Sequence, residues 1–186
     1  RPVHSSMYSH RQSLTIIDIL PSPDNCMYAQ YAAILLFAVL PCSAFEAQVV
    51  GVADGDTVTV LDAEQHQVRI RVAGIDAPEK KQPFGNRARQ AMTDFCFRER
   101  VDVDGEKHDR YRRLVAKVRC RDKDAGLEMI RQGLAWHYKA YEKEQSPADR
   151  AAYAEAEEAA RSAGIGLWRD PEPAAPWEWR RNKLPR

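Results

Sequence analysis

Three short segments of the sequence combine carboxylate and guanidinium side chains with turn-forming residues. They are residues 54–57 (DGDT), 69–79 (RIRVAGIDAPE) and 109–113 (DRYRR). Taken alone, each has an ordinary explanation, because Asp-Gly pairs are common in hairpin turns and mixed charges are common on protein surfaces. Together they supply what phosphodiester cleavage requires: positive charge that neutralises the phosphate, a group that positions water, and groups that stabilise the added negative charge in the transition state.

The residue types in these segments suggest a division of roles. Hard oxygen ligands from Asp56 and Asp76, completed by a backbone carbonyl and waters, suit Ca²⁺, whereas the sequence has no Cys/His cluster with zinc spacing. Arg71 and Arg113 each offer a planar fork that matches phosphate oxygens and that lysine does not reproduce. Glu79 is then the candidate that orients or deprotonates the attacking water.

The segments that must position these residues alternate short β patterns with turn signals. Strands are expected at residues 49–52, 57–61, 67–73, 101–103 and 114–120, and a helix at residues 85–97 follows the third strand. In the third strand the aliphatic residues alternate with Arg69 and Arg71, so the two arginines share the face opposite the aliphatic side chains.

Two further helices are expected after the last strand. The first is short and places three apolar residues on one face: Leu127, Ile130 and Leu134. The second begins at a capping signal and ends at a glycine: Ser146, Pro147, Asp149 and Gly164. These elements predict an α+β fold that is mainly β, a five-stranded and partly open OB-fold barrel with three helices.

The order and spacing of the motifs resemble those of the staphylococcal nuclease-like (thermonuclease) family. The resemblance runs from about Ala47 to Trp168. Besides the three segments above, which extend to DGDTVTV at residues 54–60, it rests on IRQGLAW at residues 130–136 and GLW at residues 166–168. It implies an OB-fold barrel with three helices that needs Ca²⁺ and hydrolyses DNA and RNA to products ending in 3′-phosphate.

Matching positions assign residues to these functions. The resemblance implies that Asp56 and Asp76 ligate Ca²⁺ and that the backbone carbonyl of Ala77 adds to the coordination. It also implies catalytic roles for three charged residues, with two arginines gripping the scissile phosphate and a glutamate serving as acid–base residue or water positioner: Arg71, Arg113 and Glu79.

Aromatic residues are a further part of the match. Tyr111 and Tyr141 fall at positions that contact the bound nucleotide in the family, and Arg110 is added to the predicted nucleotide-binding set. Stacking of bases on such rings would give broad substrate choice. For Tyr141, packing in the core is an equally good alternative.

The sequence departs from the family pattern at three places. Arg112 stands where the family usually has glycine. If that position has a positive φ, an arginine there would strain the backbone by about 1 kcal/mol. Ala77 replaces a frequent threonine, and the segment after Glu79 is short.

The N-terminal part of the chain is expected to lie outside the nuclease domain. Residues 32–40 (AAILLFAVL) are too few to span a membrane, and the small residues that follow them predict a signal peptide at residues 27–44. Residues 1–26 are interpreted as an extension that is not part of the native protein, residues 45–170 as the OB-fold domain and residues 171–186 as an irregular tail. A periplasmic or secreted protein is expected; a buried N-terminal helix is the alternative.

Cysteine usage agrees with export. Cleavage after Ala44 would remove Cys26 and Cys42 and leave Cys96 and Cys120, an even pair in an oxidising compartment. A disulfide between these two is preferred over two separate buried thiols.

Net charge does not identify the partner, since 28 Lys and Arg face 27 Asp and Glu. The expected partners are DNA and RNA substrates, preferably single-stranded, and the protein is expected to be a monomer with no obligate protein partner. A binding module that has lost catalysis is one alternative, disfavoured because all five predicted side chains of the site are present. A lipid-anchored envelope protein, tested by acylation of Cys42, is another.

Overall fold

The computed structural model describes residues 44–183 of the chain. The extension predicted at residues 1–26 and the signal peptide predicted at residues 27–44 lie outside the described residues, except for Ala44, the first residue of strand β1. Among the described residues, no helix is long and apolar enough to cross a membrane.

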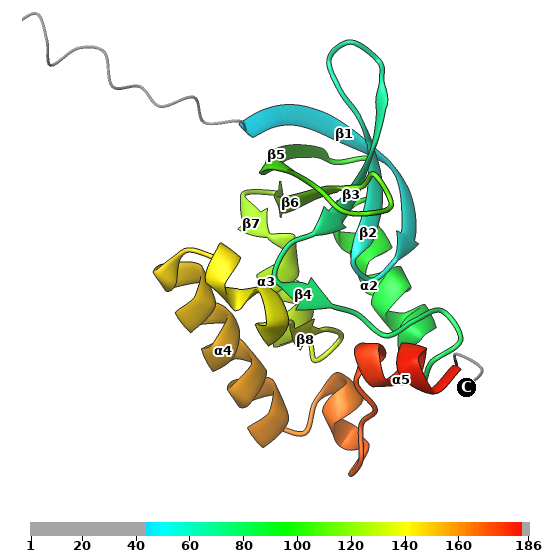
Figure 1. Cartoon of the computed structure of the whole chain (residues 1–186), viewed down its shortest axis with the longest axis vertical. Coiled ribbons are helices and arrows are strands. Elements are labelled where there is room, and N and C mark those ends of the chain that lie inside the picture. The colour runs from blue at the N-terminus through cyan, green and yellow to red at the C-terminus, as the bar shows by residue number, and fades with distance from the viewer. Residues whose placement is uncertain (1–43, 184–186) are drawn as a thin grey trace, which may run out of the picture. The chain divides into compact units, whose positions relative to one another are not determined.

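Five strands form a closed barrel (Figure 1). Their order is β3-β2-β1-β5-β6, and a parallel pairing of β3 with β6 closes the circle, whereas the other neighbours are antiparallel. The strands are β1 (Ala44–Asp54), β2 (Thr57–Leu61), β3 (Gln67–Val72), β5 (Arg100–His108) and β6 (Leu114–Cys120). The predicted fold class, a mainly β OB-type barrel, is confirmed, and the barrel is closed rather than partly open.

Strand alternation explains why the barrel has an apolar interior and a charged rim. In β3, Ile70 and Val72 are buried in the core, whereas Arg69 and Arg71 lie on the other face. Strand β1 pairs with β5 through its first half and with β2 through its second half. Two irregularities in its pairing with β2, at Val49/Gly51 and Val52/Asp54, bend the strand between its two partners.

The three predicted helices are present: α2 and α3 pack against the barrel, and α4 packs against α3 (Figure 1). They are α2 (Gly85–Cys96), α3 (Ala125–Arg131) and α4 (Pro147–Ser162). Helix α4 begins at Ser146, whose Oγ accepts a hydrogen bond from the Asp149 amide at 3.0 Å, and Gly164 with φ 58° follows its end. Short elements complete the fold: β4 (Ile75–Asp76), β7 (Lys123–Asp124), β8 (Trp136–His137), and the 3-10 helices η2 (Lys139–Glu144) and η3 (Gly166–Arg169).

The irregular tail predicted after residue 170 contains instead an α-helix, α5 (Pro176–Lys183). Pro176 occupies the first turn, where its fixed φ suits a helix start. The helix is docked, because the Trp177 ring stacks on Tyr138 at 5.4 Å and contacts Trp136 at 5.5 Å. The Gln82 side chain also donates a hydrogen bond to the Ala174 carbonyl just before the helix, at 2.6 Å.

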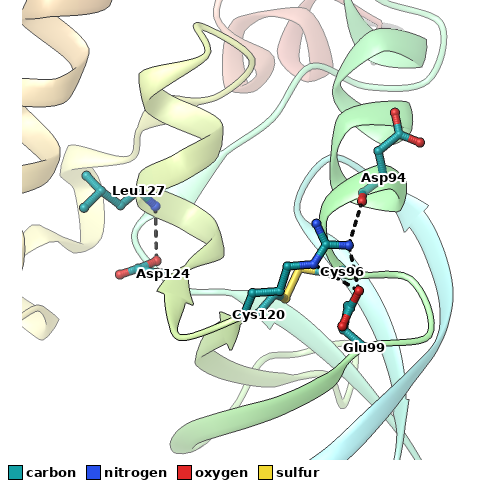
Figure 2. The surroundings of a disulfide bond; sticks show 7 residues. Asp94, Cys96, Glu99, Cys120, Asp124 and Leu127 are labelled. Carbon is teal, nitrogen blue, oxygen red and sulfur yellow. Dashed lines mark hydrogen bonds and ion pairs between the residues drawn. A yellow bond between two sulfur atoms is a disulfide. The ribbon is translucent and has the colours of Figure 1, made fainter.

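The predicted disulfide joins Cys96 to Cys120 (Figure 2). Cys96 ends α2 and Cys120 ends β6, their Cα atoms are 5.5 Å apart, and both side chains are fully buried. Beside the bond, the Arg121 guanidinium donates to Glu99 at 2.6 Å. The bond therefore ties the end of a helix to the barrel wall.

Loss of this bond should weaken the fold. Replacement of Cys96 and Cys120 by alanine opens a loop with a sequence separation of 24. In the chain-entropy account a loop of this length contributes roughly 3 kcal/mol. We expect the doubly substituted protein to lose about that much unfolding free energy in guanidinium chloride titrations. Treatment of the unsubstituted protein with reductant serves as the control and should give a comparable loss; equal stability with and without reductant would contradict this role.

Candidate active site

The turn between β1 and β2 places the first aspartates. The Asp56 amide donates to the Asp54 carboxylate at 3.1 Å, which holds the turn in shape. Gly55 lies so close to Ala77 and Ala88 that a Cβ would approach each of their Cβ atoms to 2.7 Å. Only glycine therefore allows this turn to pack against helix α2 and the segment that follows β4.

A second turn brings Asp76 to the same place. Gly74, with φ 75°, redirects the chain after β3, and Asp76 then lies in β4 opposite Trp136 of β8. Its side chain is fully buried. The amide of the next residue, Ala77, donates to Asp56 Oδ2 at 2.9 Å. Two carboxylates that are 20 positions apart in the chain are thereby brought to one site.

Arg71 links the two carboxylates. It pairs with Thr57 across strands β2 and β3, and Thr57 directly follows Asp56 in the chain. Its Nη1 is 3.2 Å from Asp56 Oδ2 and its Nη2 is 3.0 Å from Asp76 Oδ1. Nη1 also donates to the Val72 carbonyl at 2.9 Å. The Arg71 guanidinium therefore contacts the carboxylates of both Asp56 and Asp76 and lies between them.

Arg113 reaches the same cluster from the turn between β5 and β6. Asp109 organises this turn, since its Oδ1 accepts from the amides of Tyr111 and Arg113, and its Oδ2 accepts from Arg113 Nε at 2.7 Å. Arg113 Nη1 donates to Thr57 Oγ1 at 3.2 Å, and this hydroxyl donates to Asp56 Oδ1 at 3.0 Å. The two predicted phosphate-binding arginines thus converge on Asp56.

Burial and charge shift the pKa of several carboxyl groups. Burial and the nearby Asp56 charge raise the pKa of Asp54 to about 7. Burial also raises the pKa of Asp76, although Arg180 and Arg71 oppose this. Desolvation would raise the pKa of Asp109, but its hydrogen bonds from Arg113 and Tyr111 prevail and lower it. Burial is therefore the main cause of the raised pKa values of Asp54 and Asp76, whereas hydrogen bonds stabilise the ionised form of Asp109.

Glu79 lies at the edge of this cluster beside a residue that sequence reasoning did not select, Arg180 of α5. Arg180 Nη1 donates to Glu79 Oε1 at 2.8 Å, and Nη2 donates to Asp76 Oδ2 at 2.7 Å. Burial alone would lower the pKa of Arg180, but these hydrogen bonds raise it above its ordinary value. The sequence signal for this helix was Pro176, which follows a stretch rich in proline and alanine and is the first residue of α5.

The predicted nucleotide-binding residues lie on exposed surface. Tyr111 is 63% exposed, and the guanidinium groups of Arg110 and Arg113 lie over its ring at 4.8 and 5.5 Å. Tyr141 is 54% exposed and its ring centre is 5.3 Å from that of Tyr138. The alternative that Tyr141 packs in the core is therefore wrong.

The acidic cluster fits a cation. The Asp76 carboxylate is fully buried and already in contact with two guanidinium groups, from Arg71 and Arg180, so a positive charge occupies this place. Clustered carboxylate oxygens are the ligands that a hard divalent ion prefers. Among the described residues, a different group brings three possible ligand atoms within 4.8 Å of one another, in the β2–β3 turn: Asp62, Glu64 and His66.

A closed OB-type barrel with carboxylates and arginines gathered at one edge has the groups of a phosphodiester hydrolase. Comparison with known proteins agrees. Residues 69–170 match the family described as Staphylococcal nuclease homologue. The chain is 40% identical over 160 residues to a protein named micrococcal nuclease from Shigella flexneri, which covers 81% of this chain and 89% of that protein.

Two other relatives extend this picture. An uncharacterized endonuclease from Haemophilus influenzae is 37% identical over 153 residues, or 81% of this chain and 83% of that protein. Staphylococcal-like nuclease CAN1 from Arabidopsis thaliana is 41% identical over 115 residues, which cover 62% of this chain and 34% of that protein. The chain belongs to the staphylococcal nuclease family, and this membership supports a hydrolase of the nuclease type that acts on nucleic acid.

The strained turn before Arg113 offers a test of local geometry. Arg112 has φ 62°, a left-handed conformation that costs a residue with a side chain about 1–2 kcal/mol. We expect Arg112→Gly to raise the unfolding free energy in urea by up to about 1 kcal/mol, because the greater freedom of glycine in the unfolded chain offsets part of the relief. Arg112→Ala removes the same charge but keeps the Cβ, and should gain less than about 0.5 kcal/mol. Equal gains from both variants would assign the effect to charge.

Proposed function

We propose that the protein is a Ca²⁺-dependent phosphodiesterase that hydrolyses DNA and RNA to products ending in 3′-phosphate. One observation carries the proposal: a single guanidinium group, that of Arg71, bonds both Asp56 and Asp76, and Arg113 is one hydroxyl group away. Oxygen ligands suit a hard cation, and paired arginines suit a phosphate diester.

Asp56, Asp76 and the carbonyl of Ala77 would hold the ion. Bound Ca²⁺ would supply positive charge for the phosphate and a place for a water beside it. The side chains of Asp56 and Asp76 have the oxygen chemistry for this role, and their shared contact with Arg71 keeps them together. With an ion on both carboxylates, the Arg71 fork would be available for phosphate oxygens.

The remaining residues would act on the water and on the phosphate. Glu79 orients the water and accepts its proton as the oxygen attacks phosphorus. The bond from phosphorus to the 5′ oxygen breaks, which leaves a 3′-phosphate on one product and a 5′-hydroxyl on the other. Arg113 stabilises the additional negative charge, and Asp109 holds its guanidinium plane through two nitrogen contacts of 2.7 Å.

Exposed aromatic rings near the site favour substrates with unpaired bases. Tyr111 projects from the same turn as Arg113, and Tyr141 follows the β8 strand that pairs with Asp76. Base stacking on such rings tolerates any base sequence, so single-stranded DNA and RNA are the proposed substrates, bound with the help of Arg110.

We also propose that the protein works outside the cytoplasm, in the periplasm or after secretion, as a monomer. The disulfide between Cys96 and Cys120 supports the proposed location, because such bonds persist in oxidising compartments.

A metal-dependence assay tests the proposed activity. Purified protein should release acid-soluble nucleotides from heat-denatured DNA and from RNA when Ca²⁺ is added, and excess chelator should abolish the release. Mg²⁺ at equal concentration is the matched control, since its preference for octahedral geometry makes it a poorer fit to a mixed carboxylate–carbonyl site. Full activity in chelator would remove the metal from the proposal, and nucleic-acid binding without any hydrolysis would leave only a binding module.

Substitutions test the assignment of roles. We expect Glu79→Gln and Arg113→Ala to lower kcat/KM by about 10²–10⁴-fold, because each removes a group that acts on the reacting atoms. Arg113→Lys should recover little, since lysine lacks the planar fork. Arg69→Ala is the control, because Arg69 is an exposed arginine on the same strand face as Arg71. Rates of hydrolysis and melting temperatures would be measured together; unchanged rates in Glu79→Gln or Arg113→Ala would mean that other residues catalyse.

A further inference from the structure

Helix α5 brings a third guanidinium group to the proposed cation site. Arg180 bonds both oxygens of the buried Asp76 carboxylate, at 3.2 Å for Oδ1 and 2.7 Å for Oδ2. It also bonds Glu79 at 2.8 Å. The Arg180 side chain of α5 thus contacts both a proposed metal ligand, Asp76, and the proposed water-positioning residue, Glu79.

These contacts use the oxygen atoms that catalysis would need. Asp76 Oδ1 also accepts from Arg71, so both oxygens of Asp76 are engaged by guanidinium nitrogens. The hydrogen bond from Arg180 takes one acceptor position of Glu79 Oε1, so fewer positions of this carboxylate remain for a water. A second positive charge within about 4 Å of Arg180 would be repelled by roughly 1–4 kcal/mol at surface-like dielectric values.

The helix that carries Arg180 depends on docking for its stability. Helix α5 has eight residues, whereas isolated helices shorter than about 12–15 residues are marginal in water. It is held by the stacking of Trp177 on Tyr138, by the edge contact with Trp136 and by Arg180 itself. Removal of the Arg180 contacts would therefore weaken the docking of a helix that is too short to be stable alone and leave it to the remaining contacts, among them those of Trp177.

We propose that α5 is an autoinhibitory latch, in which the Arg180 guanidinium competes with the divalent cation for Asp76 and Glu79. The inference rests on the proposed function, because it takes Asp76 as a cation ligand. In the closed arrangement Arg180 neutralises the buried carboxylate in place of the ion. In the open arrangement the ion holds Asp76, Glu79 is free to bind water, and α5 leaves.

Calcium affinity without nucleic acid measures this competition. In calorimetric titrations we expect Arg180→Ala to bind Ca²⁺ at least about tenfold more tightly than the unsubstituted protein, equivalent to about 1.4 kcal/mol. Arg181→Ala is the matched control, since it removes the same charge from the next, exposed residue of the helix, and its affinity should stay within about twofold. Equal or weaker binding by Arg180→Ala would overturn the latch.

A second measurement uses the unsubstituted protein and so does not depend on the folding of a variant. Hydrogen exchange of the amides in residues 176–183 should accelerate at least about tenfold when Ca²⁺ saturates the site, while exchange in α4 stays the same or slows. Unchanged protection of α5 in the Ca²⁺-bound protein would overturn the latch and leave the proposed nuclease intact. Absence of Ca²⁺ binding in both the unsubstituted protein and Arg180→Ala would overturn the latch together with the metal dependence.

Discussion

The site depends on how a buried negative charge is balanced. An ionised carboxylate removed from water is stable only when it is paired and hydrogen-bonded, and Asp76 is fully buried. Arg71 supplies part of the compensation and also bonds Asp56, so the same guanidinium that neutralises the pair fixes its geometry. Burial, with the charge of Asp56, raises the pKa of the neighbouring Asp54 to about 7, which shows how costly ionised carboxylates are at this place.

The barrel tolerates this concentration of charge because the charged side chains lie outside its apolar core. Strand alternation sends Ile70 and Val72 inward and Arg71 outward, so the cluster sits on the rim of a closed apolar interior. Two glycines then let the chain turn where the charges must meet. Gly55 permits the close approach of the first turn to Ala77, and Gly74 takes the positive φ that redirects the chain toward Asp76.

Sequence reasoning was most successful where local chemistry dictates local structure. The limits of β2 and β6 and the cap of α4 follow from residue patterns, and Arg112 proves to have the positive φ that its glycine position suggested. The convergence of Arg71 and Arg113 needed the family resemblance, because strand register is a long-range property. Helix α5 was missed, since its stability comes from tertiary contacts of Trp177 and Arg180 and not from its eight residues alone.

The same charge balance connects the tail to the chemistry. In the proposed latch, the buried Asp76 carboxylate is compensated either by the Arg180 guanidinium or by a metal ion, which would compete for the same oxygen atoms. Arg71 also contacts Asp56 and Asp76, and would give up part of these contacts to an ion. An arginine on a rigid strand would remain nearby to meet the phosphate, whereas an arginine on a short docked helix would carry its segment away. In this proposal, the position of each arginine in the fold decides whether it stays to bind substrate or leaves with its helix.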